Sequence, residues 1–279
     1  MSGALITSWH PFLGFSSAMT RFATINPLKP LDHLAPAGRV GLISLATDFN
    51  IETDLKQLYP SDVSFFTSRV RNHNPLTIEN LRRMTPGIRD AADKILPGTG
   101  LDAVIYACTS GAIAIGVDQV TRLVQEVHPG VPVTNPATAA ITAFKTLSAK
   151  QISILTPYTE PVNRDVAALF ESFGVEVINM TGFGFEDDTA MTFIAPEDIK
   201  TAALQTCAKQ ADLLFISCTA LRASGLIADL EAQLNIPVIS SNQALAWHSL
   251  KLMNHPKPIS GFGTLMRDHL GSAAPQSRA

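Results

Sequence analysis

Two cysteines of this chain stand in closely matching surroundings. The stretches "LDAVIYACTSGAIAIG" (101–116) and "ADLLFISCTALRASGL" (211–226) each carry an acidic start, an apolar run, a Cys-Thr pair and then small residues. The two thiols belong to Cys108 and Cys218. Repetition of the whole pattern within one chain indicates a shared task rather than two unrelated core positions.

A cysteine becomes a nucleophile or a proton carrier once its pKa falls, and helix N-termini and hydrogen-bond donors lower that pKa. Each thiol here follows an apolar strand and precedes an expected helix start. The backbone N–H groups that follow, at Thr109 and Ser110 in one stretch and Thr219 in the other, can bind a carboxylate or an oxyanion. The alternative is that both cysteines are merely buried, as free cysteines often are. The matched pair favours function, so we predict Cys108 and Cys218 as catalytic residues.

Other reactive side chains give weaker signals. Cys207 in "ALQTCAKQ" is expected in mid-helix as part of the core, and His248 in "ALAWHSLK" is assigned a structural role. No Cys-x-x-Cys and no clustered histidine spacing is present, so no metal site is predicted. The stretch "GFGFEDD" (182–188) lacks the context of a dinucleotide loop and is expected to be a solvated acidic loop.

The first expected strand ends in "LATDFNIETDL" (45–55), which offers Thr47, Asp48 and Asn50 beside a helix start near Ile51. Thr47 and Asp48 are candidate substrate contacts because ligands bind at strand ends in open α/β sheets. Asp48 could equally be a helix N-cap, which is a common role for aspartate at such a position. Both interpretations stay open from the sequence.

A comparable turn, "LTPYTEPVN" (155–163), supplies Thr156 and Tyr158. A tyrosine hydroxyl at this place could donate to a substrate carboxylate or an enolate, and packing is the alternative role. Arg69 and Arg71 in "TSRVRNHNP" could anchor an anion through bidentate contacts, but they stay outside the main assignment since surface arginines are common.

Short apolar runs alternate with longer stretches of helical pattern, which is typical of an α/β protein. The runs are rich in Val, Ile and Leu without alternation, as expected for parallel strands that are covered on both faces. They are "VGLISLA" (40–46), "AVIYAC" (103–108), "QISILTP" (151–157), "LLFISC" (213–218) and "PVISS" (237–241). The helix candidates are "TIENLRRMTPGIRDAADKIL", "VDQVTRLVQEV", "EPVNRDVAALFESFG", "PEDIKTAALQTCAKQ" and "GLIADLEAQLN".

The two halves of the chain repeat this order. In each half, the cysteine follows the first strand after a nearly equal number of residues. After each cysteine come a helix and then "VPVTNPATAA" (131–140) or "IPVISSNQAL" (236–245). We therefore predict two similar Rossmann-like or flavodoxin-like lobes with parallel sheets, and an active site between them. The predicted boundaries are an extension at 1–37, a first lobe at 38–135, a second lobe at 136–242 and a tail at 269–279.

The bulk composition limits the function classes. With 279 residues, 46% hydrophobic and 16% charged, the chain reads as a compact globular protein rather than a disordered one. A net charge of −3 offers no basic field for nucleic acid or for an anionic membrane surface. The apolar N-terminal stretch lacks a basic start, so we expect it to contact the body or a neighbouring subunit of a homo-oligomer. Three cysteines without an export signal fit a cytoplasmic protein with reduced thiols.

An ordered set of motifs carries a family resemblance from about residue 38 to 268. The motifs are "GLISLATDFNIETDL", "YACTSG", "TPYTEPVN" and "SCTALRA". The chain resembles the aspartate/glutamate racemase superfamily, in the branch of maleate cis-trans isomerases and arylmalonate decarboxylases. Within that branch, "FGFEDD" and "SCTALRA" followed by "SSNQALAWH" are most similar to the ectoine-utilisation group.

The resemblance implies two pseudo-symmetric lobes, no cofactor, an interlobe site, and a C-terminal segment (243–268) that returns to the first lobe. Racemases of this kind remove a proton with one thiolate and deliver a proton to the opposite face from the other. Maleate isomerase-like enzymes would use Cys108 as nucleophile on the double bond and Cys218 for the proton. Arylmalonate decarboxylase retains only the second cysteine, so the presence of both favours isomerisation or racemisation.

The same resemblance implies carboxylate binding by Thr109, Ser110, Tyr158 and Thr219. One departure concerns Asp48, which stands where maleate isomerases commonly have asparagine. A carboxylate there would repel a diacid and would favour an amino-bearing substrate.

The leading prediction is a cofactor-independent two-cysteine isomerase or racemase that acts on a small carboxylate: an amino acid, an ectoine-related compound or a maleate-like diacid. The alternatives are a ring-opening hydrolase of an ectoine-like substrate, a decarboxylase of the arylmalonate type, and a two-lobed binding protein without catalysis. A hydrolase could survive loss of one thiol, whereas a two-thiol racemase could not.

Overall fold

The computed structural model of the chain describes residues 22–31 and 34–271. Residues 22–31 form a unit separate from the compact unit that begins at Leu34, and they contain no helix or strand. Their large apolar side chains, Phe22, Ile25, Leu28 and Leu31, are exposed. The rest of the predicted extension and residues 272–279 of the predicted tail lie outside the described residues. Contact of the extension with a neighbouring subunit stays a prediction.

The first lobe is built on four parallel strands in the spatial order β2-β1-β3-β4. The central strands β1 and β3 are almost wholly buried, which explains their continuous apolar sequences "GRVGLISL" and "AVIYA". The strand bounds are Gly38–Leu45 (β1), Val63–Val70 (β2), Ala103–Ala107 (β3) and Val133–Thr134 (β4).

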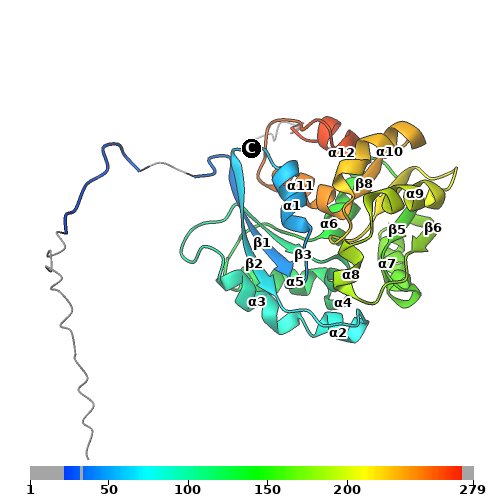
Figure 1. The fold of residues 1–279 in the computed structure, drawn as a ribbon, viewed down its shortest axis with the longest axis horizontal. Helices are drawn as coiled ribbons and strands as arrows, with labels where there is room; N and C mark the ends of the chain where they lie inside the picture. The colour runs from blue at the N-terminus through cyan, green and yellow to red at the C-terminus, as the bar shows by residue number, and fades with distance from the viewer. Residues whose placement is uncertain (1–21, 32–33, 272–279) are drawn as a thin grey trace, which may run out of the picture. The chain divides into compact units, whose positions relative to one another are not determined.

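The second lobe repeats this topology in the order β6-β5-β7-β8, again with all strands parallel. Its bounds are Gln151–Thr156 (β5), Glu176–Gly182 (β6), Leu213–Ile216 (β7) and Val238–Ser240 (β8). The predicted α/β fold with two pseudo-symmetric parallel lobes is confirmed, and Figure 1 shows the two sheets side by side within the folded unit.

Helices follow the strands in each half. In the first half they are α1 (Ile51–Leu58), α2 (Ile78–Arg82), α3 (Thr85–Asp93), α4 (Thr109–Ile115), α5 (Val117–Gln125) and α6 (Pro136–Thr146). In the second half they are α7 (Glu160–Ser172), α8 (Asp188–Thr192), α9 (Pro196–Thr206), α10 (Ile227–Leu234, after a 3₁₀ turn at Ser224–Leu226), α11 (Ser241–Leu252) and α12 (Gly263–Asp268).

Three details differ from the sequence prediction. The helix predicted over 77–96 is divided into α2 and α3 near Pro86, since proline lacks the N–H that a helix interior requires. Cys207 is not in mid-helix, because α9 ends at Thr206. The edge strands β2 and β6 were absent from the prediction, since many of their side chains are partly exposed and give no continuous apolar run.

The helix that follows the last strand of each half packs on the other half. Helix α6 contributes Phe144, which stacks edge-to-face on Phe170 of α7 and Phe215 of β7, with ring centroids 5.3 Å and 5.6 Å away. Helix α11 packs on α6 and also on α1 and β3 (Figure 1). Matching N-caps begin the two helices: Asn135 accepts from the Thr138 N–H, and Ser240 accepts from the Gln243 N–H. This crossed pair of helices joins the two sheets, and the lobe boundaries themselves stay predictions.

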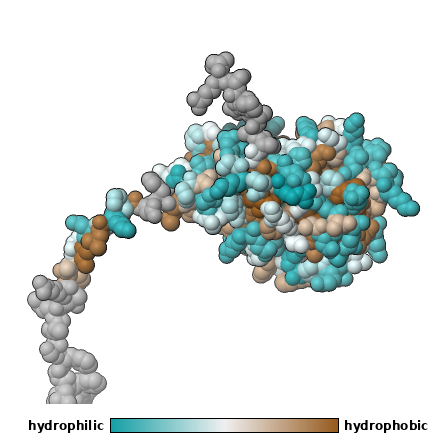
Figure 2. Space-filling view, turned by 90° about the horizontal axis from the view of Figure 1, so that it is seen from above, coloured by the Kyte–Doolittle hydropathy of each residue, from teal (hydrophilic) through white to brown (hydrophobic). Residues whose placement is uncertain are grey.

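Hydrophilic side chains dominate the face seen in Figure 2, and hydrophobic ones lie on it in scattered patches. Within the described ranges, no helix is both long and apolar enough to cross a membrane.

Candidate active site

The two cysteines occupy equivalent places in the two sheets. Cys108 directly follows β3 and forms the N-cap of α4, and Cys218 follows β7 after one intervening residue. Strands β3 and β7 hold the same position in their sheets. Both side chains are buried, with exposed fractions of 3% and 6%.

The two Cys-Thr turns touch each other directly. The Thr219 hydroxyl donates to the carbonyl of Ala107 at 3.3 Å. The Ser241 hydroxyl, at the start of α11, lies 3.1 Å from the Thr109 hydroxyl and accepts from the Cys218 N–H at 3.0 Å. The structure therefore brings the two Cys-Thr turns together, and a catalytic role for Cys108 and Cys218 stays a prediction.

Close packing fixes the position of the Cys108 thiol. The N–H of Gly111 donates to Cys108 Sγ at 3.2 Å, and the Ser110 hydroxyl lies 3.8 Å from the same sulfur. A Cβ atom at Gly111 would stand 2.8 Å from Cys108 Sγ, from Met84 Cε and from the Tyr106 hydroxyl. Glycine in "CTSG" is thus required by space beside the sulfur rather than by backbone conformation.

The environment disfavours thiolates in the unliganded protein. Burial, followed by the negative charge of Asp188, raises the pKa of Cys108 well above its ordinary value and that of Cys218 to about 12. Hydrogen bonds from Gly111 to Cys108, and from Tyr158 and the Ala220 N–H to Cys218, act in the opposite direction. The sequence-based expectation of lowered thiol pKa values is wrong for this state, because burial outweighs the donors.

Tyr158, just after β5, is buried beside Cys218. Burial is the largest cause of a pKa far above that of ordinary tyrosine, so its hydroxyl stays protonated and can donate a hydrogen bond. This geometry is compatible with the predicted role in carboxylate binding, which stays a prediction.

Asp48 lies two residues before Asn50, the N-cap of helix α1. Its Oδ1 accepts from the N–H groups of Asn50 (2.7 Å) and Ile51 (2.9 Å), and its Oδ2 accepts from the Thr219 hydroxyl at 3.0 Å. Asp48 is therefore not the N-cap itself, although it binds backbone N–H groups at the helix start, and it links the loop after β1 to the second Cys-Thr turn. Burial raises the pKa of Asp48 from 3.8, against opposing hydrogen bonds and the Arg69 charge.

Asp188, at the start of α8, is a site residue that the sequence analysis missed. Its Oδ2 accepts from the Thr47 hydroxyl at 2.7 Å and from Asn72 Nδ2 at 2.9 Å. The side chain is 8% exposed, so the prediction of a solvated acidic loop is wrong at this residue. Its neighbour Asp187 is exposed and caps α8 through the N–H groups of Thr189 and Ala190. The sequence does not indicate that, of the adjacent Asp187 and Asp188, only Asp188 is buried.

A third buried carboxylate, Asp54 of α1, supports the second Cys-Thr turn from behind. Its Oδ2 accepts from Ser224 Oγ (2.7 Å), Asn242 Nδ2 (2.7 Å) and Asn50 Nδ2 (3.2 Å). The amides of Asn50 and Asn242 also donate to the carbonyl of Thr219. This network joins α1, the loop after β7 and α11 around the site.

The remaining candidates serve structural contacts. Arg69 donates to the carbonyls of Leu45 and Asp48 and pairs with Glu52 at 2.9 Å, and Arg71 is exposed. His248 hydrogen-bonds the Thr134 hydroxyl at 2.7 Å; burial, then Lys251, lower its pKa to about 4. Cys207 is half-buried, and burial raises its pKa. Among residues 22–31 and 34–271, no group of three or more His, Cys, Asp or Glu side chains could hold a metal ion.

The chain matches one family of known proteins over most of its length. The sequence profile of the arylmalonate decarboxylase family matches residues 40–266. The chain belongs to this family. The maleate isomerase of Nocardia farcinica is 25% identical to it over 241 residues, which make up 82% of this chain and 95% of that relative. The arylmalonate decarboxylase of Bordetella bronchiseptica is 23% identical over 238 residues, with coverage of 81% and 95%.

Solved structures agree with this assignment at the level of the fold. One is a Cys-to-Ser variant of the Nocardia farcinica maleate cis-trans isomerase with a covalently bound succinylcysteine intermediate. It is 24% identical, covers 82% of this chain and 98% of its own, and has a TM-score of 0.77.

Proposed function

We propose that this protein is a cofactor-independent isomerase or racemase that acts on a small carboxylate through Cys108 and Cys218. The observation that carries the proposal is the contact between the two Cys-Thr turns, through Thr219 to Ala107 and through Ser241. This contact supports the proposal because it holds the two cysteine-bearing turns, one from each lobe, next to each other. The covalent succinylcysteine in the related maleate isomerase supports the use of a cysteine on a carboxylate substrate.

Two thiols permit two balanced sequences of steps. In an adduct route, Cys108 Sγ forms a C–S bond to one alkene carbon, the π bond breaks, and Cys218 delivers a proton to the other carbon. After rotation about the new single bond, the Cys218 thiolate removes a proton from that same carbon, the double bond forms again and the C–S bond breaks. In a proton-transfer route, one thiolate takes the α-proton and the other thiol donates to the opposite face.

The substrate carboxylate would bind to the backbone N–H groups of Thr109 and Ser110, which have no partner within α4 because they start that helix. The Tyr158 hydroxyl would add a donor from the other lobe. The Thr219 hydroxyl already donates to Asp48, so its proposed contact with substrate would use its backbone N–H. These donors would also stabilise negative charge that develops on the carboxylate during either route.

Decarboxylation is the second candidate, since an arylmalonate decarboxylase is among the relatives. Such an enzyme protonates a carbanion from one side and needs only one thiol, whereas this chain keeps both. Ring opening of an ectoine-like substrate is a further alternative, which a single nucleophilic cysteine would suffice to catalyse.

The identity of the product distinguishes these reactions. We would incubate the protein in deuterium oxide with maleate, L-aspartate, L-2,4-diaminobutyrate, ectoine or phenylmalonate and follow each compound by NMR. The proposal predicts isomerisation, or incorporation of deuterium at a carbon atom of a compound that keeps all its carbon atoms. Release of CO₂ from phenylmalonate, or ring opening of ectoine without carbon-bound deuterium, would replace it with the corresponding alternative.

A further inference from the structure

The segments that carry the two cysteines are held in different ways. Cys108 is the N-cap of helix α4, and the N–H of Gly111 in that helix donates to its sulfur at 3.2 Å. Cys218 lies in an irregular stretch, residues 217–223, which we call the Cys218 loop. Among the described residues, no backbone N–H from Cys218 to Arg222 donates to a backbone carbonyl. The position of the second thiol therefore depends on side chains from other elements.

Two asparagine amides hold this loop by its carbonyl groups. Asn50 Nδ2 donates to the carbonyls of Thr219 (3.0 Å) and Leu221 (3.1 Å), and Asn242 Nδ2 donates to that of Thr219 at 2.9 Å. Asn50 is the N-cap of α1, yet its side chain makes no capping hydrogen bond and reaches the second half of the chain instead. Both asparagines are almost fully buried. One amide from each half of the chain thus anchors the loop.

Asp54 determines which way these two amides face. It stands one turn after Asn50 on α1 and is buried as well. Its Oδ2 accepts from Asn242 Nδ2 at 2.7 Å and from Asn50 Nδ2 at 3.2 Å, so the nitrogen of each amide, rather than its oxygen, faces the loop carbonyls. The same oxygen accepts from the hydroxyl of Ser224, the residue directly after the loop, at 2.7 Å. One carboxylate oxygen is therefore shared by both amides and by the end of the loop.

The carboxylate also explains why Asn242 keeps an unsatisfied oxygen. Asn242 Oδ1 is buried and accepts no hydrogen bond from the described residues. A buried acceptor without a donor is unfavourable, so this orientation persists because the nitrogen faces two acceptors, Asp54 and the Thr219 carbonyl. Without Asp54 only the carbonyl would oppose a turn of the amide, and a turned amide would direct its oxygen at that carbonyl and release it.

We propose that Asp54 is a positioning residue for the Cys218 thiol: it orients the amides of Asn50 and Asn242, and these hold the Cys218 loop by its carbonyls. This inference rests on the proposed function, in which Cys218 exchanges a proton with a carbon atom of the substrate. Such a transfer needs reacting atoms about 3–3.5 Å apart, and a displacement of about 1 Å lowers the rate about 100-fold. Asp54 acts through the loop and does not touch the substrate.

The first test needs no substrate. Iodoacetamide alkylation of each thiol would be followed at one fixed pH by peptide mass spectrometry in a Cys207→Ser background. Asp54→Leu removes the shared acceptor and should speed alkylation of Cys218 about tenfold or more, because the released loop opens more often, while Cys108 in its helix changes less than about threefold.

Glu231→Leu is the matched control for the loss of a carboxylate that accepts several hydrogen bonds. The half-buried Glu231 of α10 accepts from the N–H of Val238 and from the N–H and hydroxyl of Thr264. None of these donors belongs to the Cys218 loop, so the variant loses three hydrogen bonds and should leave the ratio of the two alkylation rates unchanged.

Turnover tests the catalytic consequence with a compound that the parent protein converts. Asp54→Leu should lower kcat about 100-fold. Asp54→Asn keeps an oxygen that can accept from the same three donors, so its kcat should stay within about threefold of the parent. If Asp54→Leu does not fold, Asn242→Ala takes its place, since it removes one of the two amides and should also speed alkylation of Cys218 selectively.

The inference is overturned if Cys218 and Cys108 respond equally, if neither responds, or if Glu231→Leu produces the same selective change. Parental kcat in Asp54→Leu would overturn it too, while the two-thiol function would stand. A selective response of Cys218 in a protein that converts no compound would support the role of Asp54 in placing the loop and would count against the proposed function alone.

Discussion

The thiols of the unliganded protein should be almost entirely protonated near neutral pH, and the pH dependence of alkylation can show this. With a pKa of about 12 for Cys218, about one molecule in 10⁴ carries its thiolate at pH 8, against roughly a quarter for an ordinary cysteine. Reaction of Cys218 with iodoacetamide should therefore rise about tenfold per pH unit from pH 7 to 10 without a plateau. Limited access slows the reaction at every pH but leaves this slope unchanged.

Asp188→Asn should raise the alkylation rate of both thiols at every pH from 7 to 10, because the carboxylate charge raises both thiol pKa values. On this slope a thiol pKa that is lower by one unit raises the rate about tenfold at each pH, so we expect an increase of about tenfold or more. The assay is peptide mass spectrometry of alkylated Cys108 and Cys218 in a Cys207→Ser background, with Glu186→Gln, which removes an exposed carboxylate, as the charge-matched control. A plateau below pH 9 in the parent protein, or an unchanged rate in Asp188→Asn, would refute this electrostatic account.

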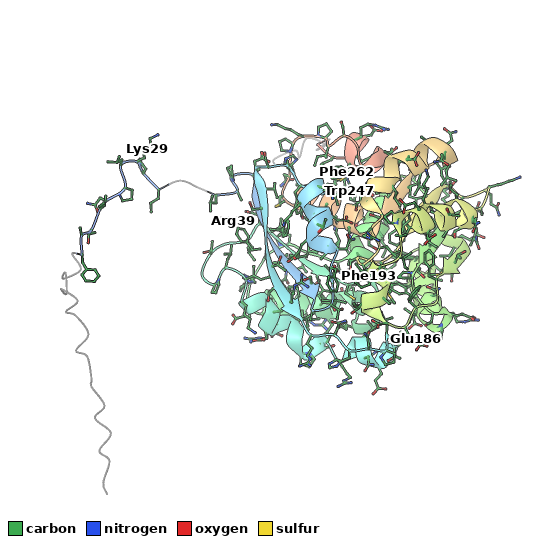
Figure 3. All side chains as sticks on the ribbon, in the orientation of Figure 1. Lys29, Arg39, Glu186, Phe193, Trp247 and Phe262 are labelled. Atoms are coloured by element: carbon green, nitrogen blue, oxygen red, sulfur yellow. The ribbon has the colours of Figure 1, made fainter. Side chains whose placement is uncertain are left out.

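Substitutions at three further positions test the packing around the site. Gly111→Ala should lower turnover about 100-fold and cost about 1–3 kcal/mol in urea unfolding, since the new Cβ would stand 2.8 Å from Cys108 Sγ; unchanged turnover would show that the sulfur position is not critical. Asp54→Ala should lower the free energy of unfolding by about 3 kcal/mol at pH 7, because three hydrogen-bond donors lose their acceptor. Burial raises the pKa of Asp54 above 3.8, so the stability that this group contributes is present at low pH and is lost as the pH rises. Asp54→Asn should accordingly cost less at pH 7 than at pH 4, and urea unfolding that shows the reverse would contradict the sign. Phe193→Ala should speed alkylation of both buried thiols about 2- to 10-fold at each pH and leave the slope unchanged. The exposed Phe193 (Figure 3) packs on Phe49, with ring centroids 5.8 Å apart, across the two lobes. An unchanged rate would show that this pair does not limit access.

Most of the fold could be predicted because the buried strands of both lobes are continuous apolar runs. The two cysteines could be predicted as well, since the order of strand, Cys-Thr and small residues is local in sequence and occurs twice. Arg69 was harder to place, because a guanidinium near a strand end can bind a substrate or, as here, the carbonyls of Leu45 and Asp48.

Asp188 escaped prediction for a different physical reason. Its inward position is held by Thr47 and Asn72, which lie more than a hundred positions away in the other half of the chain. Local sequence cannot report such a contact. The direction of the thiol pKa shift was missed for the same reason, since burial and a distant carboxylate determine it while the motif shows only the nearby donors. Because burial and Asp188 raise the thiol pKa values, slow alkylation of the free protein does not by itself favour a binding protein over an enzyme.

The most direct test of the two-thiol mechanism is the rate of carbon-bound deuterium incorporation or isomerisation in Cys108→Ser and in Cys218→Ser, each compared with Cys207→Ser. The assay would use whichever compound the parent protein turns over. The account predicts a loss of about 10³-fold or more in each of the first two variants and near-parental rates in Cys207→Ser. Substantial activity in either Cys108→Ser or Cys218→Ser would contradict a mechanism in which both thiols take part.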